Sequence, residues 1–134
     1  MRYVIAIEKG DKKHVYGVVV PDLPGCFSAG DTLDEALSNA KEAILLHLEG
    51  LMDEKKTAPA PKPLEAHQKD RKYKGWTWAV IEVDLADLGD KTERINITLP
   101  RKVLRVIDEA AKRSGESRSG YLARVGIESV RRTG

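Results

Sequence analysis

The sequence predicts an α+β protein made of two modules. Residues 1–84 show the pattern β-β-β-α-β, and residues 93–134 show one strand followed by two helices. The charge divides at the same place: residues 1–90 hold 12 Lys and Arg against 16 Asp and Glu, whereas residues 91–134 hold 11 against 5. A chain of 134 residues can contain two small domains. We therefore expect a linker over residues 85–92 and a basic module that faces a polyanion.

The first module is predicted to begin with three strands. Residues 2–8 alternate as a strand does, residues 10–13 favour a turn, and residues 14–20 form a second β-rich run, which together predict a hairpin. Residues 21–25 contain two prolines and a glycine, which favour a tight turn because proline has no N–H and glycine tolerates positive φ. A short strand around residues 26–28 is expected next.

A long helix is predicted after these strands. Asp31 or Thr32 can serve as its N-cap, and Thr32 with Glu35 fits a capping box. Apolar residues then recur at three- and four-residue spacing over about six turns: Leu33, Ala36, Leu37, Ala40, Ile44, Leu48 and Leu51.

The end of the first module is expected to be a loop and a last strand. Residues 57–75 begin with alternating alanine and proline and continue with charged side chains, so we expect an exposed loop. Residues 76–84 alternate with period two and place Trp76, Trp78 and Val80 on one face. Core packing is the favoured role of the two tryptophans.

The basic module is predicted to be a strand over residues 93–99, a helix over residues 100–113 and a helix over residues 118–132. Pro100 suits the first helical position, Gly115 suits a left-handed residue after a helix, and Ser117 is a good N-cap. About 42 residues with one strand cannot enclose a core, so a partner is required. We expect at least a two-fold homodimer whose strands pair antiparallel into a ribbon.

Alternation assigns the two faces of this ribbon. Ile95, Ile97 and Leu99 would face the helices, which leaves the polar side chains of Arg94, Asn96 and Thr98 on the outer face. A two-stranded ribbon fits the major groove, where Arg bonds guanine, Asn bonds adenine and Thr contacts either edge atoms or the thymine methyl group. We expect these three residues to read bases in DNA.

The start of the second basic helix is expected to bind a DNA phosphate. Ser117, Arg118 and Ser119 place free amides, two hydroxyl groups and a cation at the positive end of a helix dipole. Such contacts fix register, whereas base contacts specify sequence.

Two resemblances extend these expectations. Arg94-Ile95-Asn96-Ile97-Thr98-Leu99-Pro100, followed by Gly115-Glu116-Ser117-Arg118-Ser119, resembles the ribbon-helix-helix family of bacterial repressors, which implies the same base-reading and phosphate-binding residues. The first module resembles the HicB antitoxin domain over Tyr16-Gly17-Val18-Val19-Val20-Pro21-Asp22-Leu23-Pro24-Gly25-Cys26-Phe27 and the helix start after it. That resemblance implies a partial ribonuclease-H-like fold, a HicA-type toxin that cleaves messenger RNA as partner, and repression of the shared operon.

The sequence offers little support for an enzyme. A metal-dependent nuclease needs converging carboxylates, but Asp22 lies in a turn, and Asp31, Asp34 and Glu35 are explained as capping residues. The histidines His14, His47 and His67 have no metal-ligand spacing, and Cys26 is expected to be a small buried hydrophobic residue. We expect no catalytic residue, no metal and no cofactor.

No segment is long and apolar enough to span a membrane and the start does not fit a signal peptide, so a cytoplasmic protein is expected. The alternative to an antitoxin is a ribbon-helix-helix transcription regulator that senses a small ligand and has no toxin partner.

Overall fold

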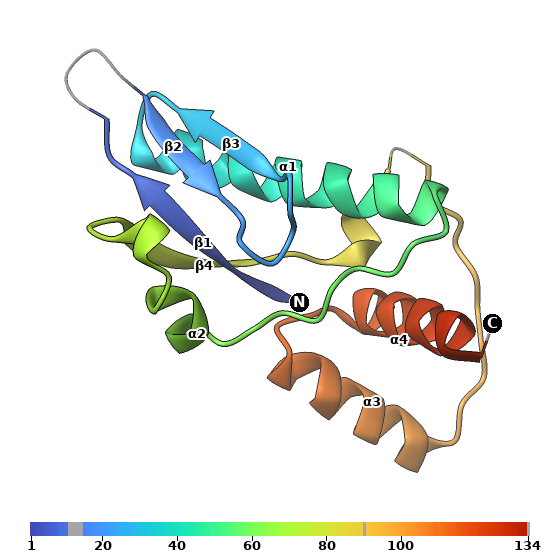
Figure 1. Cartoon of the computed structure of the whole chain (residues 1–134). Coiled ribbons are helices and arrows are strands. Elements are labelled where there is room, and N and C mark those ends of the chain that lie inside the picture. The colour runs from blue at the N-terminus through green and yellow to red at the C-terminus, as the bar shows by residue number, and fades with distance from the viewer. Residues whose placement is uncertain (11–14, 90, 134) are drawn as a thin grey trace. The chain divides into compact units, whose positions relative to one another are not determined.

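The chain folds into two compact units in this computed structural model, which describes residues 1–10, 15–89 and 91–133 (Figure 1). The N-terminal unit comprises residues 2–82, and the C-terminal unit comprises Met1 and residues 83–134. Strands and helices are mixed along the chain, which confirms the predicted α+β class.

The N-terminal unit is built on a four-stranded antiparallel sheet with the strand order β3-β2-β1-β4. Its strands are β1 (Arg2–Glu8), β2 (Tyr16–Val19), β3 (Phe27–Gly30) and β4 (Thr77–Glu82). The predicted hairpin is confirmed, since β1 pairs antiparallel with β2, with Ile7 opposite Val18. Of its expected turn, residues 11–13 lie outside the described residues, as does His14.

Helix α1 (Leu33–Asp53) covers one face of the sheet and begins as predicted. The Thr32 hydroxyl oxygen accepts a hydrogen bond from the Glu35 amide at 3.1 Å. Gly30 lies so close to α1 that a Cβ at this position would overlap the Ala36 backbone, and this absence of a side chain lets the helix lie directly on β3. The side chains that α1 buries are Ala36, Ala40, Ile44 and Leu48.

The expectation of an exposed loop over residues 57–75 is wrong for its second half. The segment contains α2 (Leu64–Gln68) and the 3-10 helix η1 (Arg71–Tyr73), and both His67 and Tyr73 are buried. The Tyr73 ring meets the rings of Trp76 and Trp78 edge to face, at centroid distances of 5.3 and 5.4 Å. The polar composition of residues 57–75 led to the prediction of a loop, whereas a few buried ring side chains hold the second half of the segment in place.

A buried polar contact fastens the same segment to the proline-rich turn. The Asp22 Oδ1 atom accepts a hydrogen bond from the Lys62 amide at 3.0 Å and lies 3.0 Å from His67 Nε2. The His67 ring also stacks on Trp78, with centroids 6.4 Å apart. Asp22 therefore has a structural role that its position in a turn did not indicate.

The C-terminal unit contains the 3-10 helix η2 (Leu85–Asp87), α3 (Arg101–Arg113) and α4 (Arg118–Thr133). Residues 85–87 were expected in a linker, but η2 packs against α4 and so forms part of this unit. The turn between α3 and α4 follows the prediction, because Gly115 has φ of 68°.

The strand predicted over residues 93–99 does not form in the single chain. Residues 91–100 belong to no helix or strand, and Ile95 and Ile97, which were expected to face the helices, are 74% and 60% exposed. A strand exists only where its N–H and C=O groups pair with a neighbouring strand. Within residues 1–10, 15–89 and 91–133, no strand lies beside this segment.

His67→Ala should lower the free energy of unfolding of the N-terminal unit by roughly 1–3 kcal/mol, because Asp22 would stay buried after losing one of its partners. Urea unfolding followed by tryptophan fluorescence measures this change, because both tryptophans, Trp76 and Trp78, lie in the N-terminal unit. His47→Ala on α1 serves as the control, with an expected change within about 0.5 kcal/mol. Equal losses in the two variants would contradict a specific role for His67.

Candidate nucleic-acid interface

The start of α4 has the cap that the sequence predicted. The Ser117 Oγ atom accepts a hydrogen bond from the Gly120 amide at 3.0 Å, and the Ser117 carbonyl accepts from the Tyr121 amide at 2.9 Å. Ser117 is thus the N-cap residue, and Gly120 occupies the third helical position. The predicted phosphate-binding residues Ser117, Arg118 and Ser119 are exposed at this end.

A carboxylate of the same unit already occupies this helix start. The Asp84 Oδ2 atom accepts a hydrogen bond from the Ser117 amide at 2.8 Å, and its Oδ1 atom accepts from the Ala86 amide at 2.8 Å. Burial raises the pKa of Asp84, but the hydrogen bonds from Ser117 and Ala86 outweigh it, so the pKa lies below its usual value. Asp84 is therefore held as an anion at the positive end of α4.

Arg118, which was expected to bind phosphate, is paired with Asp108 on α3. Its Nε and Nη2 atoms donate to the two carboxylate oxygens of Asp108 at 2.8 and 2.9 Å. This bidentate contact lowers the pKa of Asp108. Both side chains are about half exposed, so water and salt screen the pair.

A buried ion pair fixes the turn that presents Ser117. The Glu116 side chain is fully buried and accepts hydrogen bonds from Arg124 Nε at 3.0 Å, from Arg124 Nη2 at 3.0 Å and from Ser114 Oγ at 2.6 Å. Burial raises the pKa of Glu116, but the bonds from Arg124 and Ser114 outweigh it and hold the pKa below its ordinary value of 4.5. This pair was not predicted, because a lone Glu before an N-cap carries no signal of burial in the sequence.

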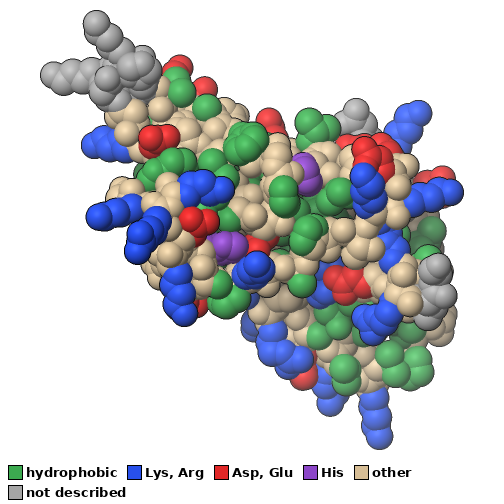
Figure 2. Space-filling model, in the orientation of Figure 1, with side chains coloured by type: hydrophobic (Ala, Val, Ile, Leu, Met, Phe, Trp, Pro, Cys, Tyr) green, Lys and Arg blue, Asp and Glu red, His purple; other side chains and the backbone are tan. Residues whose placement is uncertain are grey.

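The predicted base-reading residues lie in the extended segment before α3. Arg94, Asn96 and Thr98 are all exposed, alternating with the exposed side chains of Ile95 and Ile97. In Figure 2, basic side chains project around α3 and α4, with hydrophobic side chains exposed among them. The large apolar residues that stay exposed on the two helices are Val103, Val106, Val125 and Val130.

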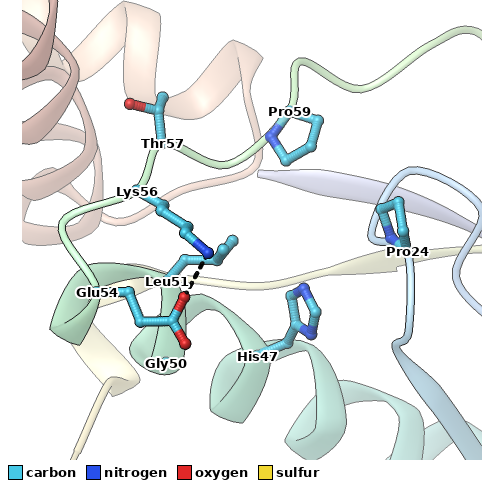
Figure 3. Close-up of a pocket in the computed structure, with 8 residues that line it drawn as sticks. All are labelled: Pro24, His47, Gly50, Leu51, Glu54, Lys56, Thr57 and Pro59. Carbon is cyan, nitrogen blue, oxygen red and sulfur yellow. Dashed lines mark ion pairs between the residues drawn. The ribbon is translucent and has the colours of Figure 1, made fainter.

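The N-terminal unit has exposed apolar side chains and an open cleft. Phe27 on β3 and Val80 on β4 are 65% and 54% exposed, on the face of the sheet away from α1. The cleft, of about 650 Å³, lies between the end of α1 and the turn at Pro24 (Figure 3). Its two charged lining residues, Glu54 and Lys56, pair with each other at 2.8 Å, so neither points to a charged ligand.

The described part of the chain contains no candidate metal site. No group of three or more His, Cys, Asp or Glu side chains within residues 1–10, 15–89 and 91–133 is arranged to hold a metal ion. Cys26 is buried, as predicted, and burial raises the pKa of its thiol. Among the described helices, none has the length and apolarity needed to cross a membrane.

Comparison with known proteins gives one consistent family. The profile described as "HicB_like antitoxin of bacterial toxin-antitoxin system" matches residues 3–126. A 14.9 kDa protein from the rep-hol intergenic region of Haemophilus phage HP1 is 44% identical over 127 residues, which are 93% of this chain and 94% of the phage protein.

Solved structures agree with this result. The Burkholderia pseudomallei antitoxin HicB is similar with a TM-score of 0.72 and 42% identity, covering 96% of this chain and 98% of the antitoxin. A chain in the HicA3 and HicB3 toxin–antitoxin complex is similar with a TM-score of 0.55 and 34% identity, covering 63% of this chain and 99% of the other.

Glu116→Gln should destabilise the chain most at neutral pH and progressively less in acid. A carboxylate whose pKa is lowered by folding adds stability above its ordinary pKa, and that stability is lost as the pH falls through the lowered value. The difference in melting temperature between the two proteins, followed by circular dichroism, should therefore shrink below about pH 4.5. Glu109→Gln on the exposed side of α3 is the control, and its melting temperature should change little at any pH. If Glu116→Gln lowers the melting temperature by the same amount at every pH, the ion pair is not the cause.

Proposed function

The chain belongs to the HicB-like antitoxin family of bacterial toxin–antitoxin systems, and from this premise we propose that it inhibits a HicA-type ribonuclease toxin and represses its own operon. Residues 1–84 would bind and block the toxin, which cleaves messenger RNA. Residues 93–134 would bind operator DNA as a ribbon-helix-helix dimer. The match to an antitoxin family over nearly the whole chain is the observation that carries this proposal.

The toxin-binding half rests on the N-terminal unit. The structure of the N-terminal domain of the Burkholderia pseudomallei HicB covers 63% of this chain, and the similar chain in the HicA3 and HicB3 complex covers the same share. Phe27 and Val80 supply exposed apolar surface of the kind that a partner covers. Net charge adds little support for toxin binding, because residues 2–82 hold 12 basic and 13 acidic side chains. The other acidic residues before residue 91 lie outside this unit: Asp84, Asp87 and Asp90.

The DNA-binding half requires a second copy of the chain. Ile95 and Ile97 are exposed in one copy, and an antiparallel partner strand would pair their backbone and cover their side chains. Arg94, Asn96 and Thr98 are symmetric about Asn96, so we place the two-fold axis of the ribbon beside Asn96. These side chains then project into the major groove, where each good bidentate base contact discriminates by roughly 1–3 kcal/mol.

The phosphate contacts are proposed at the start of α4. Ser117 and Ser119 place two exposed hydroxyl groups at a helix N-terminus, and Arg118 adds a cation there. Because Arg118 is held by Asp108, DNA binding would exchange one oxyanion partner of this guanidinium for another. These contacts set register and carry no base preference.

Arg94→Ala and Asn96→Ala should each abolish binding to the DNA upstream of the chain's own gene and leave toxin inhibition intact. The reason is that both side chains belong to the proposed ribbon and not to the N-terminal unit. Operator binding is measured by fluorescence anisotropy, and inhibition by growth rescue of cells that express a HicA-type toxin, which we expect to be encoded beside this gene. Lys102→Ala, which also removes one exposed cation, is the control and should weaken DNA binding only modestly.

Two outcomes would count against this division of roles. Loss of growth rescue by the folded Arg94→Ala protein would place the toxin contact in the ribbon. Unchanged sequence preference in Asn96→Ala would show that the bases are read elsewhere.

A further inference from the structure

We propose that Asp84 is an internal competitor of the DNA phosphate at the start of α4, so that this carboxylate must leave before the phosphate can bind. The inference deepens the proposed DNA-binding function and rests on it for its ligand. The observation behind it is that the Asp84 carboxylate, which belongs to the same unit, accepts a hydrogen bond from the Ser117 amide at 2.8 Å.

The local geometry shows that this place is built for Asp84. In a capping box, the residue at the third helical position sends a carboxylate back to the amide of the N-cap residue. Here Gly120 stands at that position and has no side chain, and Asp84 supplies the carboxylate from 33 residues earlier in the chain. A Cβ at Gly120 would overlap Asp84 Oδ1, so the glycine makes the room that the carboxylate fills.

A phosphate and Asp84 cannot use the same amide together. Both are anions that bind the Ser117 N–H at the positive end of the helix, and two negative charges in contact there would repel each other. The groups that bond Asp84 keep its pKa below the usual value after the opposing effect of burial, so the carboxylate is charged at neutral pH. A phosphate that bonds the Ser117 amide must therefore displace Asp84.

The second carboxylate at this end, Asp108, is a weaker competitor. Its pair with Arg118 lies on the surface, and both side chains are about half exposed. Because water and salt screen such a pair, replacing Asp108 by a phosphate on Arg118 costs little free energy. Asp84 instead has one oxygen on Ser117 and the other on Ala86, at the start of η2. Displacing Asp84 also removes the side-chain cap of η2. The conformation of residues 84–87 therefore affects how tightly the start of α4 binds DNA.

The experiment compares full-length Asp84→Asn with full-length Asp87→Asn. Both variants lose one negative charge from the same short segment, but Asp87 is exposed and Asp84 holds the helix start. An asparagine oxygen accepts from the Ser117 amide more weakly than a carboxylate does, so α4 keeps a cap that phosphate displaces more readily. Fluorescence anisotropy with DNA from upstream of the gene should show binding about five- to tenfold tighter for Asp84→Asn, and less than about twofold tighter for Asp87→Asn.

A second measurement tests the same inference without DNA. Inorganic phosphate is titrated into the isotopically labelled full chain while the Ser117 amide resonance is followed by NMR. The resonance should move at lower phosphate concentration in Asp84→Asn, and also in Gly120→Ala, in which the new Cβ expels the carboxylate. Asp87→Asn should behave as the unmodified chain does.

The outcomes separate the two proposals. Equal tightening by Asp84→Asn and Asp87→Asn would show a general charge effect and overturn the inference. A Ser117 resonance that responds to phosphate identically in all the variants would overturn it as well. If the unmodified chain and Asp84→Asn both fail to bind DNA, the proposed repressor function is contradicted, and the phosphate titration alone decides whether Asp84 competes.

Discussion

Among the residues that the structure describes, no strand lies beside the backbone of residues 91–100, and this constraint governs the C-terminal unit. Ile95 and Ile97 are exposed on an extended segment, and Val106 and Val130 are exposed on the two helices that follow. Exposed apolar side chains in such number are a cost that a second copy can remove. The proposed ribbon would cover them, and the outward direction of Arg94, Asn96 and Thr98 follows from it.

The N-terminal unit is under no such constraint, which explains how the two halves can have separate roles. Its sheet has α1 on one face, and the segment that carries His67 and Tyr73 packs on part of the other. A unit with its own core can present a fixed surface to a toxin whether or not DNA is bound. The C-terminal unit, as we propose it, would instead depend on assembly, and the start of α4 would exchange Asp84 for a DNA phosphate. A HicB-type antitoxin that also regulates its operon needs a fixed surface for the toxin and a second unit whose state changes when it binds DNA.

Local signals in the sequence predicted most of the fold, and contacts between distant residues were what it could not predict. Thr32, Gly115 and Ser117 lie within a few residues of the groups they satisfy, so their roles were predicted correctly. The contact of Asp22 with His67 spans 45 residues and that of Asp84 with Ser117 spans 33, and neither has a periodic pattern. The strand predicted over residues 93–99 is absent for another reason, because the pairing that we propose for it needs a second copy of the chain.

The most direct test of this account is oxidative cross-linking of full-length Asn96→Cys. Residues that face each other across the axis of an antiparallel ribbon have Cα atoms about 4.5–5.5 Å apart, a separation that a disulfide bridges. The chain's own Cys26 is buried, so the introduced thiol is the accessible one. The account predicts a disulfide-linked dimer on a non-reducing gel for Asn96→Cys and none for Lys112→Cys on the exposed side of α3. A monomeric band for Asn96→Cys, or equal cross-linking of both variants, would contradict the ribbon.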